Sequence, residues 1–553
     1  MPESFIDGVI TAFYNSCIDW KIESEMGTPK SRYKKNGRIE KTLGAVYTPP
    51  RIASSLVRWA VRSPHDRVCD PACGEGVFLA AARTRLADLG NPHPTCLGVD
   101  IDPIAASRSG AERADFFEWF ETAPRFDVVV GNPPFIRSHL FSDKSRDLAF
   151  WHMRTMGLNP SRLMSTWAPF LALSSQLLTE TGRLAFVIPE ELLHINYAEE
   201  IRRHLLSFFR RVIVCLPGHE LFSSVQQSVV LLLCEKDRSG PEGLFSISFS
   251  DLEDGELERL EPAPVWSWTS KWTHLFLDDK ERRFLDGLFS RLNWKAIKDH
   301  GRVEVGVVTG DNSFFLLKKG LAENIGQEYM QPIISSARDL SGLNFSTQDF
   351  GRLARDGRPL YVLMTDEPIK NLPPQLKSYL KHGMEMGVNS RYKCRIREPW
   401  YAVPGIWPAQ ALLLRQAGEM PRLVHLNKKL ASTDTIHRVR WNEPALGKRY
   451  VTGFLNTSTL IFCEIMGRSY GGGVLELMPG EANKIPIPEP VEKLEAIFDD
   501  VDALIRNKEY YRGLDVVDKV VKPKWLNKED SDNARTILCK LIERRKHKQN
   551  GIH

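Results

Sequence analysis

Residues 68–79 read VCDPACGEGVFL, and this stretch sets the architecture of the first half of the chain. A short apolar strand ends at Asp70, a turn with Gly74 and Gly76 follows, and a helical pattern then begins. Glycine adopts positive φ without a Cβ penalty and lets a ligand approach the backbone closely. The spacing is neither the GxGxxG dinucleotide pattern nor a P-loop, so the turn by itself indicates only a strand–helix unit.

Further strand and helix patterns alternate on the C-terminal side of this turn. The strand-like runs are TCLGVDID (95–102), FDVVVGNPPF (126–135), RLAFVIPE (183–190), RVIVCLP (211–217) and SVVLLLCE (228–235). Short buried strands alternating with helices are typical of a mostly parallel sheet with helices on both faces. The last two runs are too close in sequence for a crossover helix, so they should pair antiparallel. We therefore predict an α/β fold with a Rossmann-like sheet, mostly parallel with an antiparallel edge hairpin.

Changes in sequence texture divide the 553 residues into five parts. We expect an N-terminal arm at 1–43, the α/β domain at 44–262 and a linker helix at 263–300. Irregular strands and loops predict a second, mixed α+β domain at 301–490. The remainder, 491–553, has helical patterns and ends in a basic tail.

Composition excludes several classes of protein. With 42% hydrophobic and 26% charged residues, the chain has an ordinary globular composition rather than a disordered or fibrous one. No uncharged apolar run reaches the ~18 residues of a membrane-spanning helix, and the N-terminus lacks the pattern of a signal peptide. Nine cysteines without a CxxC pair favour free thiols in a reducing cytoplasm. The net charge of +5 permits nucleic-acid binding without requiring it.

Acidic residues follow the next strands of the predicted sheet. Asp100 ends the second strand, where an acid can accept hydrogen bonds from two ribose hydroxyls. Asp115 could accept from an adenine amino group, and Phe116 could stack on the ring. Taken singly, each has an equally ordinary structural explanation as a helix cap, a loop residue or a buried aromatic.

The buried strand at 126–131 runs into Asn132-Pro133-Pro134-Phe135. Two prolines stiffen the turn and remove backbone donors, which leaves the Pro133 carbonyl free to accept. The Asn132 side-chain oxygen is a second acceptor, and Phe135 supplies a face for a flat ring. Two acceptors in a rigid turn suit a planar amino group with two hydrogens. Three such elements in order along one sheet are hard to explain as structure alone.

With these motifs in order, the sequence resembles the adenine-N6 DNA methyltransferases of the gamma arrangement, the group typified by the Taq and Eco57I modification enzymes. The N-terminal motifs that carry the resemblance are GAVYTPP (44–50), DPACGEG (70–76), GVDIDP (98–103), ADF (114–116), NPPF (132–135), RLAFVIPEELL (183–193) and LFSSVQQSVVLLL (221–233). The downstream ones are GVVTGDNSFF (306–315), KCRIREPWYAVP (393–404) and GGGVLELMPGEANKIPIP (471–488).

The resemblance implies a role for each matching residue. The cofactor, S-adenosyl-L-methionine, would be bound by Thr48, Asp70, Ala72, Gly74, Gly76, Asp100, Ile101, Asp115 and Phe116. The catalytic turn would be Asn132, Pro133, Pro134 and Phe135, with Asn132 and Pro133 accepting from the target amine and Phe135 and Phe222 stacking on the base. Two positions depart from the pattern: Phe135 stands where Tyr is commoner, and Val225 stands where a basic residue is expected.

The implied activity is site-specific methylation of adenine N6 in double-stranded DNA, on a base flipped out of the helix, in a restriction-modification or phage-defence system. Residues 301–490 would recognise the target. The basic residues expected to contact DNA are Arg391, Lys393, Arg395, Arg397, Lys428 and Lys429. We expect no metal, a cytoplasmic monomer and no membrane partner; a separate cognate restriction endonuclease is a further candidate partner.

Two other functions remain open at this point. An S-adenosylmethionine-dependent enzyme acting on RNA or on a protein glutamine would also use an NPP turn. A non-catalytic DNA-binding defence protein with a methylase fold would show damaged cofactor residues, whereas Asp70, Gly74, Gly76, Asp100 and Asn132 are all in place.

Overall fold

The computed structural model describes residues 48–217, 228–237, 241–255, 257, 260–266, 269–470 and 473–547. The predicted N-terminal arm, Phe222 and Val225 therefore lie outside the described residues. Within the described part, no helix is both long and apolar enough to cross a membrane.

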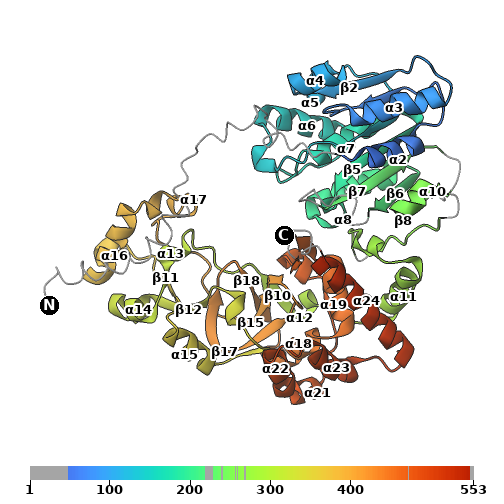
Figure 1. Ribbon diagram of the computed structural model, residues 1–553. Coiled ribbons are helices and arrows are strands. Elements are labelled where there is room, and N and C mark those ends of the chain that lie inside the picture. Colours follow the sequence, from blue (N-terminus) through green and yellow to red (C-terminus); the bar gives the residue numbers. More distant parts are fainter. Residues whose placement is uncertain are drawn as a thin grey trace. The chain divides into compact units, whose positions relative to one another are not determined.

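The first domain is built on a sheet of strand order β3-β2-β1-β4-β5-β7-β6-β8 (Figure 1). Its strands are β1 (Val68–Asp70), β2 (Cys96–Asp100), β3 (Glu112–Arg113), β4 (Phe126–Gly131), β5 (Leu178–Pro189), β6 (Arg211–Leu216), β7 (Val229–Glu235) and β8 (Gly243–Ser248). The five neighbouring strands β3, β2, β1, β4 and β5 run parallel to one another. The strand order reverses at β1, which lies between β2 and β4. In doubly wound sheets, ligands bind at the carboxyl ends of the strands beside such a reversal.

Two groups of helices contact this sheet (Figure 1). The helices α2 and α3 pack together, with α2 against β4 and β5, while α7 packs against β5, α6 and α9. The helices of this domain are α2 (Pro50–Ala60), α3 (Val77–Asp88), α4 (Pro103–Ser109), α5 (Phe116–Trp119), α6 (Asp143–Thr155), α7 (Trp167–Gln176), α8 (Glu191–His194), α9 (Glu199–Phe208) and α10 (Phe249–Asp254). The predicted α/β fold is confirmed.

One detail of the sheet differs from the prediction. Strands β6 and β7 do pair antiparallel, with Val212 opposite Cys234, but they are not at the edge. Strand β7 lies between β5 and β6, and β8 pairs parallel with β6 as the last strand. The sequence GLFSIS of β8 buries Leu244, Phe245 and Ile247, and sequence analysis had assigned no strand to it.

A second large sheet lies in the C-terminal half, with the order β10-β18-β15-β17-β12-β14-β11 and β13 paired to β17. Its strands are β10 (Gly301–Glu304), β11 (Leu316–Leu317), β12 (Met330–Ile334), β13 (Asn344–Phe345), β14 (Tyr361–Leu363), β15 (Ala409–Leu414), β17 (Leu423–Ser432) and β18 (Ile436–Trp441). Smaller sheets pair β16 (Gln416–Ala417), β19 (Arg468–Tyr470) and β20 (Val474–Glu476), and β9 (Lys295–Ala296) with β21 (Pro486–Ile487). This agrees with a mixed α+β domain.

Helices pack around and beyond this sheet. Those between 279 and 395 are α11 (Asp279–Arg291), α12 (Ile297–His300), α13 (Asn312–Phe315), α14 (Lys319–Ile325), α15 (Thr347–Arg355), α16 (Pro374–Glu385) and α17 (Tyr392–Arg395). Those from 447 onward are α18 (Gly447–Phe454), α19 (Thr457–Met466), α20 (Pro479–Ala482), α21 (Glu492–Ala496), α22 (Phe498–Arg506), α23 (Tyr510–Val521) and α24 (Lys528–His547).

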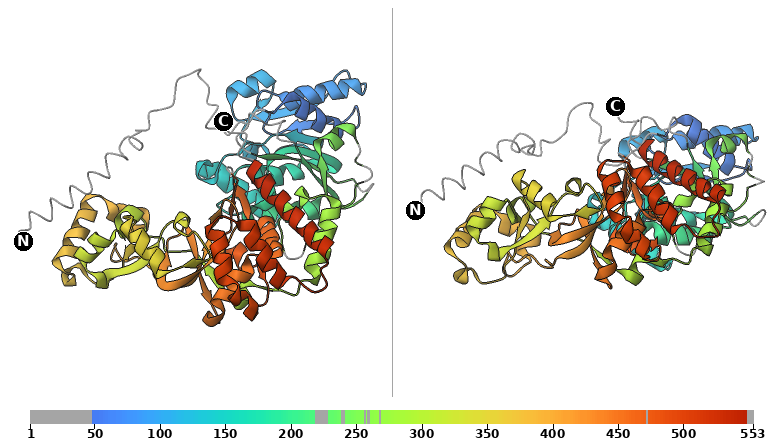
Figure 2. Two further views of the ribbon diagram at one scale, coloured as in Figure 1. Left: turned by 60° about the horizontal axis from the view of Figure 1, so that its bottom comes forward. Right: turned by 90° about the horizontal axis from the view of Figure 1, so that it is seen from below.

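The helices after residue 490 are not a separate tail. Leu285 of α11, Leu460 of α19, Val501 of α22 and Leu538 of α24 belong to one hydrophobic core. Figure 2 shows these red C-terminal helices against the orange ones, and α24 packs on α19. The hydrophobic core therefore crosses the predicted boundaries of the linker helix and the tail, because the apolar faces of these amphipathic helices need one another for burial.

Candidate active site

Strand β1 ends at Asp70, whose side chain is only 1% exposed. Its Oδ1 accepts a hydrogen bond from the Ala72 N–H at 3.2 Å, while its Oδ2 has no partner within the described part of the chain. Burial, together with the nearby Asp100 carboxylate, raises the pKa of the Asp70 carboxyl to about 8, although the Ala72 N–H lowers it in part. A buried carboxyl with a vacant acceptor is suited to a ligand that brings a cation or a donor.

The two glycines of the following turn serve different purposes. Both have positive φ, +51° at Gly74 and +84° at Gly76, where α3 begins. A Cβ on Gly76 would lie 2.9 Å from the Ser109 Cβ, so this glycine is needed for packing against α4. A Cβ on Gly74 would meet no atom within 4 Å, so open space lies beside that backbone. The turn thus leaves room for a ligand at Gly74.

Asp100 at the end of β2 is tied to the same turn. Its Oδ2 accepts from the Gly74 N–H at 2.8 Å, and its Oδ1 accepts from the Asp102 N–H at 2.8 Å. Ile101 next to it is 54% exposed, which is unusual for a large apolar side chain. Asp102 caps α4 through the Ile104 N–H, as its position before Pro103 predicts. The structure therefore brings Asp70, Gly74, Asp100 and an exposed apolar side chain together, as the sequence predicted.

The next predicted pair is placed differently. Asp115 caps α5 through the Phe117 N–H, and its other oxygen accepts from the Ser145 hydroxyl at 2.7 Å. Phe116 is 3% exposed and stacks on Phe170 with ring centroids 4.4 Å apart. Its ring is therefore part of the core here, and its predicted contact with the cofactor stays a prediction. The role of Asp115 stays a prediction.

Strand β4 leads into the acceptor turn. The Asn132 amide donates from Nδ2 to the Thr48 hydroxyl at 3.0 Å, and Thr48 is 3% exposed. This bond orients the amide, because a carboxamide has its carbonyl oxygen opposite its donor end. Thr48, which the resemblance assigns to cofactor binding, thus lies beside Asn132.

The two prolines are fixed by a residue that sequence analysis missed. The Thr166 hydroxyl donates to the Pro134 carbonyl and accepts from the Ile136 N–H at 3.0 Å, and its backbone N–H donates to the Ile136 carbonyl. Phe135 is 9% exposed and packs in the core of the domain, so its ring faces are largely covered here. The described hydrogen bonds occupy the Pro134 carbonyl and leave the Pro133 carbonyl unbonded.

A glycine joins the acceptor turn to the Asp70 turn. A Cβ added to Gly131 would lie 2.6 Å from Asp70 Oδ1, so the ends of β1 and β4 are in direct contact. The sequence signal was available, because Gly131 immediately precedes the Asn-Pro-Pro turn. Thr166, by contrast, is 32 residues from Pro134 and has no motif around it.

Most of the basic residues predicted to contact DNA have contacts within the protein. Arg391 pairs with buried Asp311 at 2.7 Å, and Arg397 donates to the Thr309 and Val308 carbonyls at 2.7 and 2.8 Å. Lys393 and Arg395 lie beside the Tyr392 ring, each 5.6 Å from its centroid. Lys428 lies over the Phe350 ring at 4.6 Å, and Lys429 is exposed. Arg397 therefore has a structural role, while Lys393, Arg395 and Lys429 point outward from the fold.

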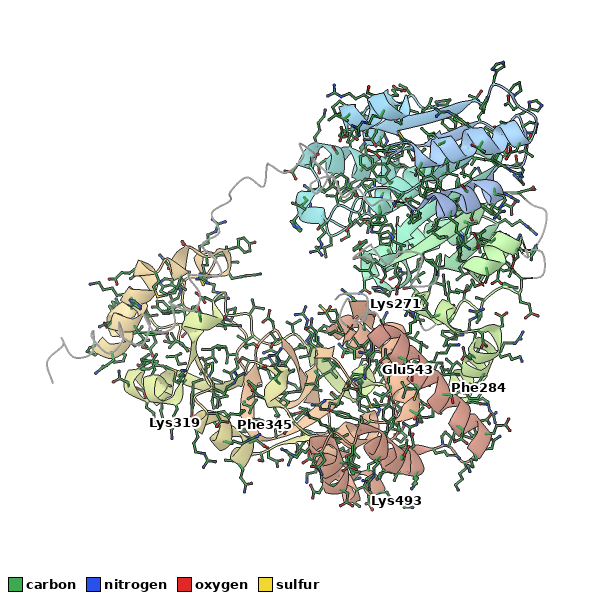
Figure 3. All side chains as sticks on the ribbon, viewed as in Figure 1. Lys271, Phe284, Lys319, Phe345, Lys493 and Glu543 are labelled. Carbon is green, nitrogen blue, oxygen red and sulfur yellow. The ribbon has the colours of Figure 1, made fainter. Side chains whose placement is uncertain are left out.

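Two arginines of the basic end of the chain are also internal. Arg545 is 1% exposed and holds Glu464 through Nη2 at 3.0 Å, and Arg544 pairs with Glu190. Lys271, labelled in Figure 3, is buried against Glu481 at 2.7 Å, and its burial lowers its pKa to about 8. These cations join segments far apart in the sequence and are unavailable to a phosphate.

Three protein families match parts of the chain. N-6 DNA Methylase matches residues 34–107, Eco57I restriction-modification methylase matches 95–215, and the C-terminal domain of Type II methyltransferase M.Eco57I matches 269–522. Together these matches cover both domains.

Curated relatives match most of the length. Type II methyltransferase M.AccI of Acinetobacter calcoaceticus is 22% identical over 82% of this chain and 87% of its own length. Type II methyltransferase M.XamI of Xanthomonas campestris pv. amaranthicola is 24% identical over 82% of this chain and 86% of its own. A solved structure of the restriction-modification enzyme MmeI with DNA aligns over 90% of this chain and 72% of its own, at 13% identity and a TM-score of 0.48. Over residues 95–215 and 269–522 the chain is therefore similar to the methylase domain and the C-terminal domain of the Eco57I-type modification methylases.

Proposed function

We propose that the protein is an S-adenosyl-L-methionine-dependent DNA methyltransferase that modifies N6 of a target adenine in double-stranded DNA. One observation carries the proposal: the acceptor turn at Asn132 and Pro133 is fixed from both sides and adjoins the Asp70 turn through Gly131. An amine held at the first turn would therefore lie beside a ligand held at the second.

The residues at the carboxyl ends of β1 and β2 fit the proposed cofactor. Asp70 offers a vacant buried acceptor, which suits the ammonium of the methionine part. The open space at Gly74 allows close backbone approach, Asp100 suits the ribose hydroxyls, and exposed Ile101 suits one face of the adenine. When bound, the cofactor supplies an electrophilic methyl group on a sulfonium.

The protein's part in the reaction is to orient and stabilise the target amine. Its lone pair is delocalised into the purine ring, so it is a weak nucleophile. The Asn132 Oδ1 and the Pro133 carbonyl would accept its two hydrogens and stabilise the positive charge that develops on nitrogen. Such preorganised acceptors need no reorganisation during the reaction. Thr48 and Thr166 act as positioning residues, because they fix Asn132 and the turn.

The target amine is out of reach of such a pocket while the base is stacked in a duplex. We therefore propose that the base is flipped out, as in other enzymes that modify bases in DNA. Phe135 would supply one stacking face, which requires its ring to become more exposed than its present 9%. Phe222, outside the described residues, stays the proposed second face.

The C-terminal domain would supply affinity and choice of sequence. Of the predicted set, Lys393, Arg395, Lys428 and Lys429 remain candidates for phosphate or base contacts. One asymmetric site requires one protomer, so we propose a monomer, with a separate cognate endonuclease as a candidate partner in a restriction-modification or phage-defence system. The rival substrates are RNA and a protein glutamine, and the rival class is a non-catalytic DNA-binding protein.

The experiment is to sequence host DNA for N6-methyladenine with and without expression of this chain. Methylation of one adenine within a defined short sequence, dependent on expression, is the expected result. Purified protein with labelled cofactor should then methylate duplex DNA in preference to RNA. Cofactor binding without methylation of DNA, RNA or protein would support the non-catalytic alternative and overturn the proposal.

A further inference from the structure

We propose that the loop 305–310 and helix α17 form one surface that contacts the bases of duplex DNA, with the ring of Tyr392 inserted between or against them. The inference rests on the proposed function and adds which part of the second domain meets bases and by what chemistry. Two observations support it: the contacts that join the two segments, and the apolar and basic side chains that these segments expose.

The two segments are joined by direct contacts. Arg397, just after α17, donates to the Val308 and Thr309 carbonyls, and Arg391, just before it, pairs with Asp311. A Cβ on Gly310 would lie 3.0 Å from Cys394 Sγ, so the loop backbone packs directly on α17. The neighbouring elements α13 and α17 are seen in Figure 1.

The loop is also fixed to the central sheet. The Val307 N–H donates to the Ser432 carbonyl at 2.6 Å, and Val307 forms a bridge with Thr433. A Cβ on Gly306 would lie 2.1 Å from the Thr433 carbonyl oxygen, so only glycine fits there. The surface is therefore ordered before any ligand arrives, which reduces the entropy lost on binding.

This surface exposes large apolar side chains. Tyr392 is 62% exposed and Ile396 60%, while Val305 and Val308 are each 39% exposed. Soluble proteins leave single apolar residues exposed, but a group on one preformed surface indicates an interaction site. An exposed aromatic ring can stack on any base.

Charge complementarity identifies the partner. Lys393 and Arg395 each lie over the Tyr392 ring, 5.6 Å from its centroid, so two cations accompany the exposed ring. Arg391 adds a third charge, partly balanced by Asp311. Cations beside an apolar wedge match the phosphates and the stacked bases of a nucleic acid, and inserted apolar side chains kink or unstack duplex DNA. An apolar protein partner would not require this set of charges.

The test measures binding of the full-length protein to a short duplex carrying the sequence that it methylates. Tyr392→Ala should weaken binding by about ten-fold to a hundred-fold, the range found when one base-stacking aromatic is removed. Tyr392→Phe should bind like the wild type, because the ring is retained. A 2-aminopurine placed in turn at each position of the duplex should report stacking that Tyr392→Ala abolishes.

Two control variants separate the ring from the charges. Lys393→Ala with Arg395→Ala should lower the slope of log K against log salt by roughly 2, while Tyr392→Ala leaves the slope unchanged. Tyr511→Ala removes another exposed tyrosine, on α23, and should leave binding unchanged. Thermal unfolding of each variant confirms that the exposed substitutions do not disturb folding.

Wild-type affinity for Tyr392→Ala, or failure of Tyr392→Phe to retain binding, would overturn the inference while leaving methylation itself intact. If the wild-type chain methylates no DNA, the proposed function is wrong, and the inference that depends on it is wrong as well. A Tyr392→Ala protein that binds the duplex normally but loses binding to another protein would show that the surface serves a protein partner instead.

Discussion

Two regions of the molecule differ in whether their polar groups are already paired. One is the carboxyl end of the first sheet, and the other is the set of basic residues in the C-terminal half. In the first sheet, Asp70 keeps a buried oxygen that has no hydrogen-bond partner among the described residues, and none of their atoms fills the space at Gly74. In the C-terminal half, Arg397, Arg545 and Lys271 are occupied by the protein's own carbonyls and carboxylates. The first arrangement leaves capacity for a ligand, whereas the second uses its charges to hold the fold.

The difference shows why charge alone does not identify a nucleic-acid contact. A cation close in sequence to other cations can be 1% exposed, as Arg545 is, when an acid from a distant segment meets it. Unused hydrogen-bonding capacity and exposure are better indicators, and they select Asp70 in one region and Lys393, Arg395 and Lys429 in the other.

The substitution Arg545→Ala should have the largest effect on stability, and it tests whether the buried cations of the C-terminal half hold the fold. The change leaves Glu464 buried without its partner, and four backbone carbonyls, of Ala417, Gly418, Glu419 and Gly473, lose a donor as well. We expect a loss of about 3–5 kcal/mol in the free energy of unfolding, measured by denaturant titration. Lys546→Ala, in an exposed pair with Glu419, is the matched control and should cost less than about 1 kcal/mol. Equal stability of both variants would contradict the structural role of Arg545.

Arg397→Ala should have the next largest effect. Two carbonyls, of Val308 and Thr309, lose a charged donor, so we expect about 1–3 kcal/mol of destabilisation. The salt dependence of DNA binding should hardly change, because this guanidinium faces the protein. A lower salt slope with unchanged stability would mean that Arg397 contacts phosphate after all.

Asp70 makes cofactor binding depend on pH. In the free protein its raised pKa, about 8, keeps the carboxyl protonated at neutral pH, whereas a cationic ligand favours the carboxylate and lowers that pKa. Binding below pH 8 must therefore release a proton, and affinity should rise about ten-fold per pH unit before levelling off above pH 8. Calorimetry in buffers of different ionisation enthalpy measures the released proton.

The matched control for this dependence is Asp70→Asn, which keeps the shape and cannot titrate. The cofactor's own amine contributes equally to the number of protons released by the two proteins, so subtracting one number from the other leaves the contribution of Asp70. An identical number of protons released by both proteins would contradict the assignment.

Lys429→Ala should have the smallest effect of the series. The side chain is exposed, so stability should change by less than about 0.5 kcal/mol. If Lys429 contacts a phosphate, the slope of log K against log salt should fall by roughly 0.9. An unchanged slope would remove it from the candidates and narrow the DNA contacts toward α17.

Sequence reasoning found most of what short motifs encode. Asp70, Gly74, Asp100 and Asn132 were predicted because each lies at or just after the end of a strand, within a short motif. Thr166 was missed because it contacts Pro134, a residue far from it in the chain. Gly131 was missed although it immediately precedes the Asn-Pro-Pro turn, because its contact with Asp70 becomes visible only in the fold. Phe116 was assigned to a ligand because its partner in the stack, Phe170, is 54 residues away in sequence.

The C-terminal half was predicted less well for the same reason. Its strands pair in an order unrelated to chain order, and its basic residues find partners far along the chain, as Arg545 does with Glu464 over 81 residues. The position of β7 inside the first sheet follows the same rule, because β7 pairs with both β5 and β6 and β8 extends the sheet beyond β6. Local patterns predict elements, but only tertiary contacts decide which side chains remain available.

The most direct test of the central claim uses the Asn132→Ala variant and an unmodified duplex that carries the sequence methylated by the wild-type protein. Methyl transfer and cofactor binding are measured on the same preparation. The account predicts a fall in turnover of about 10²–10³, the loss expected when one preorganised group is removed, with cofactor affinity close to that of the wild type. Wild-type turnover, or a fall explained entirely by lost cofactor affinity, would contradict the assignment of Asn132 as the acceptor for the target amine.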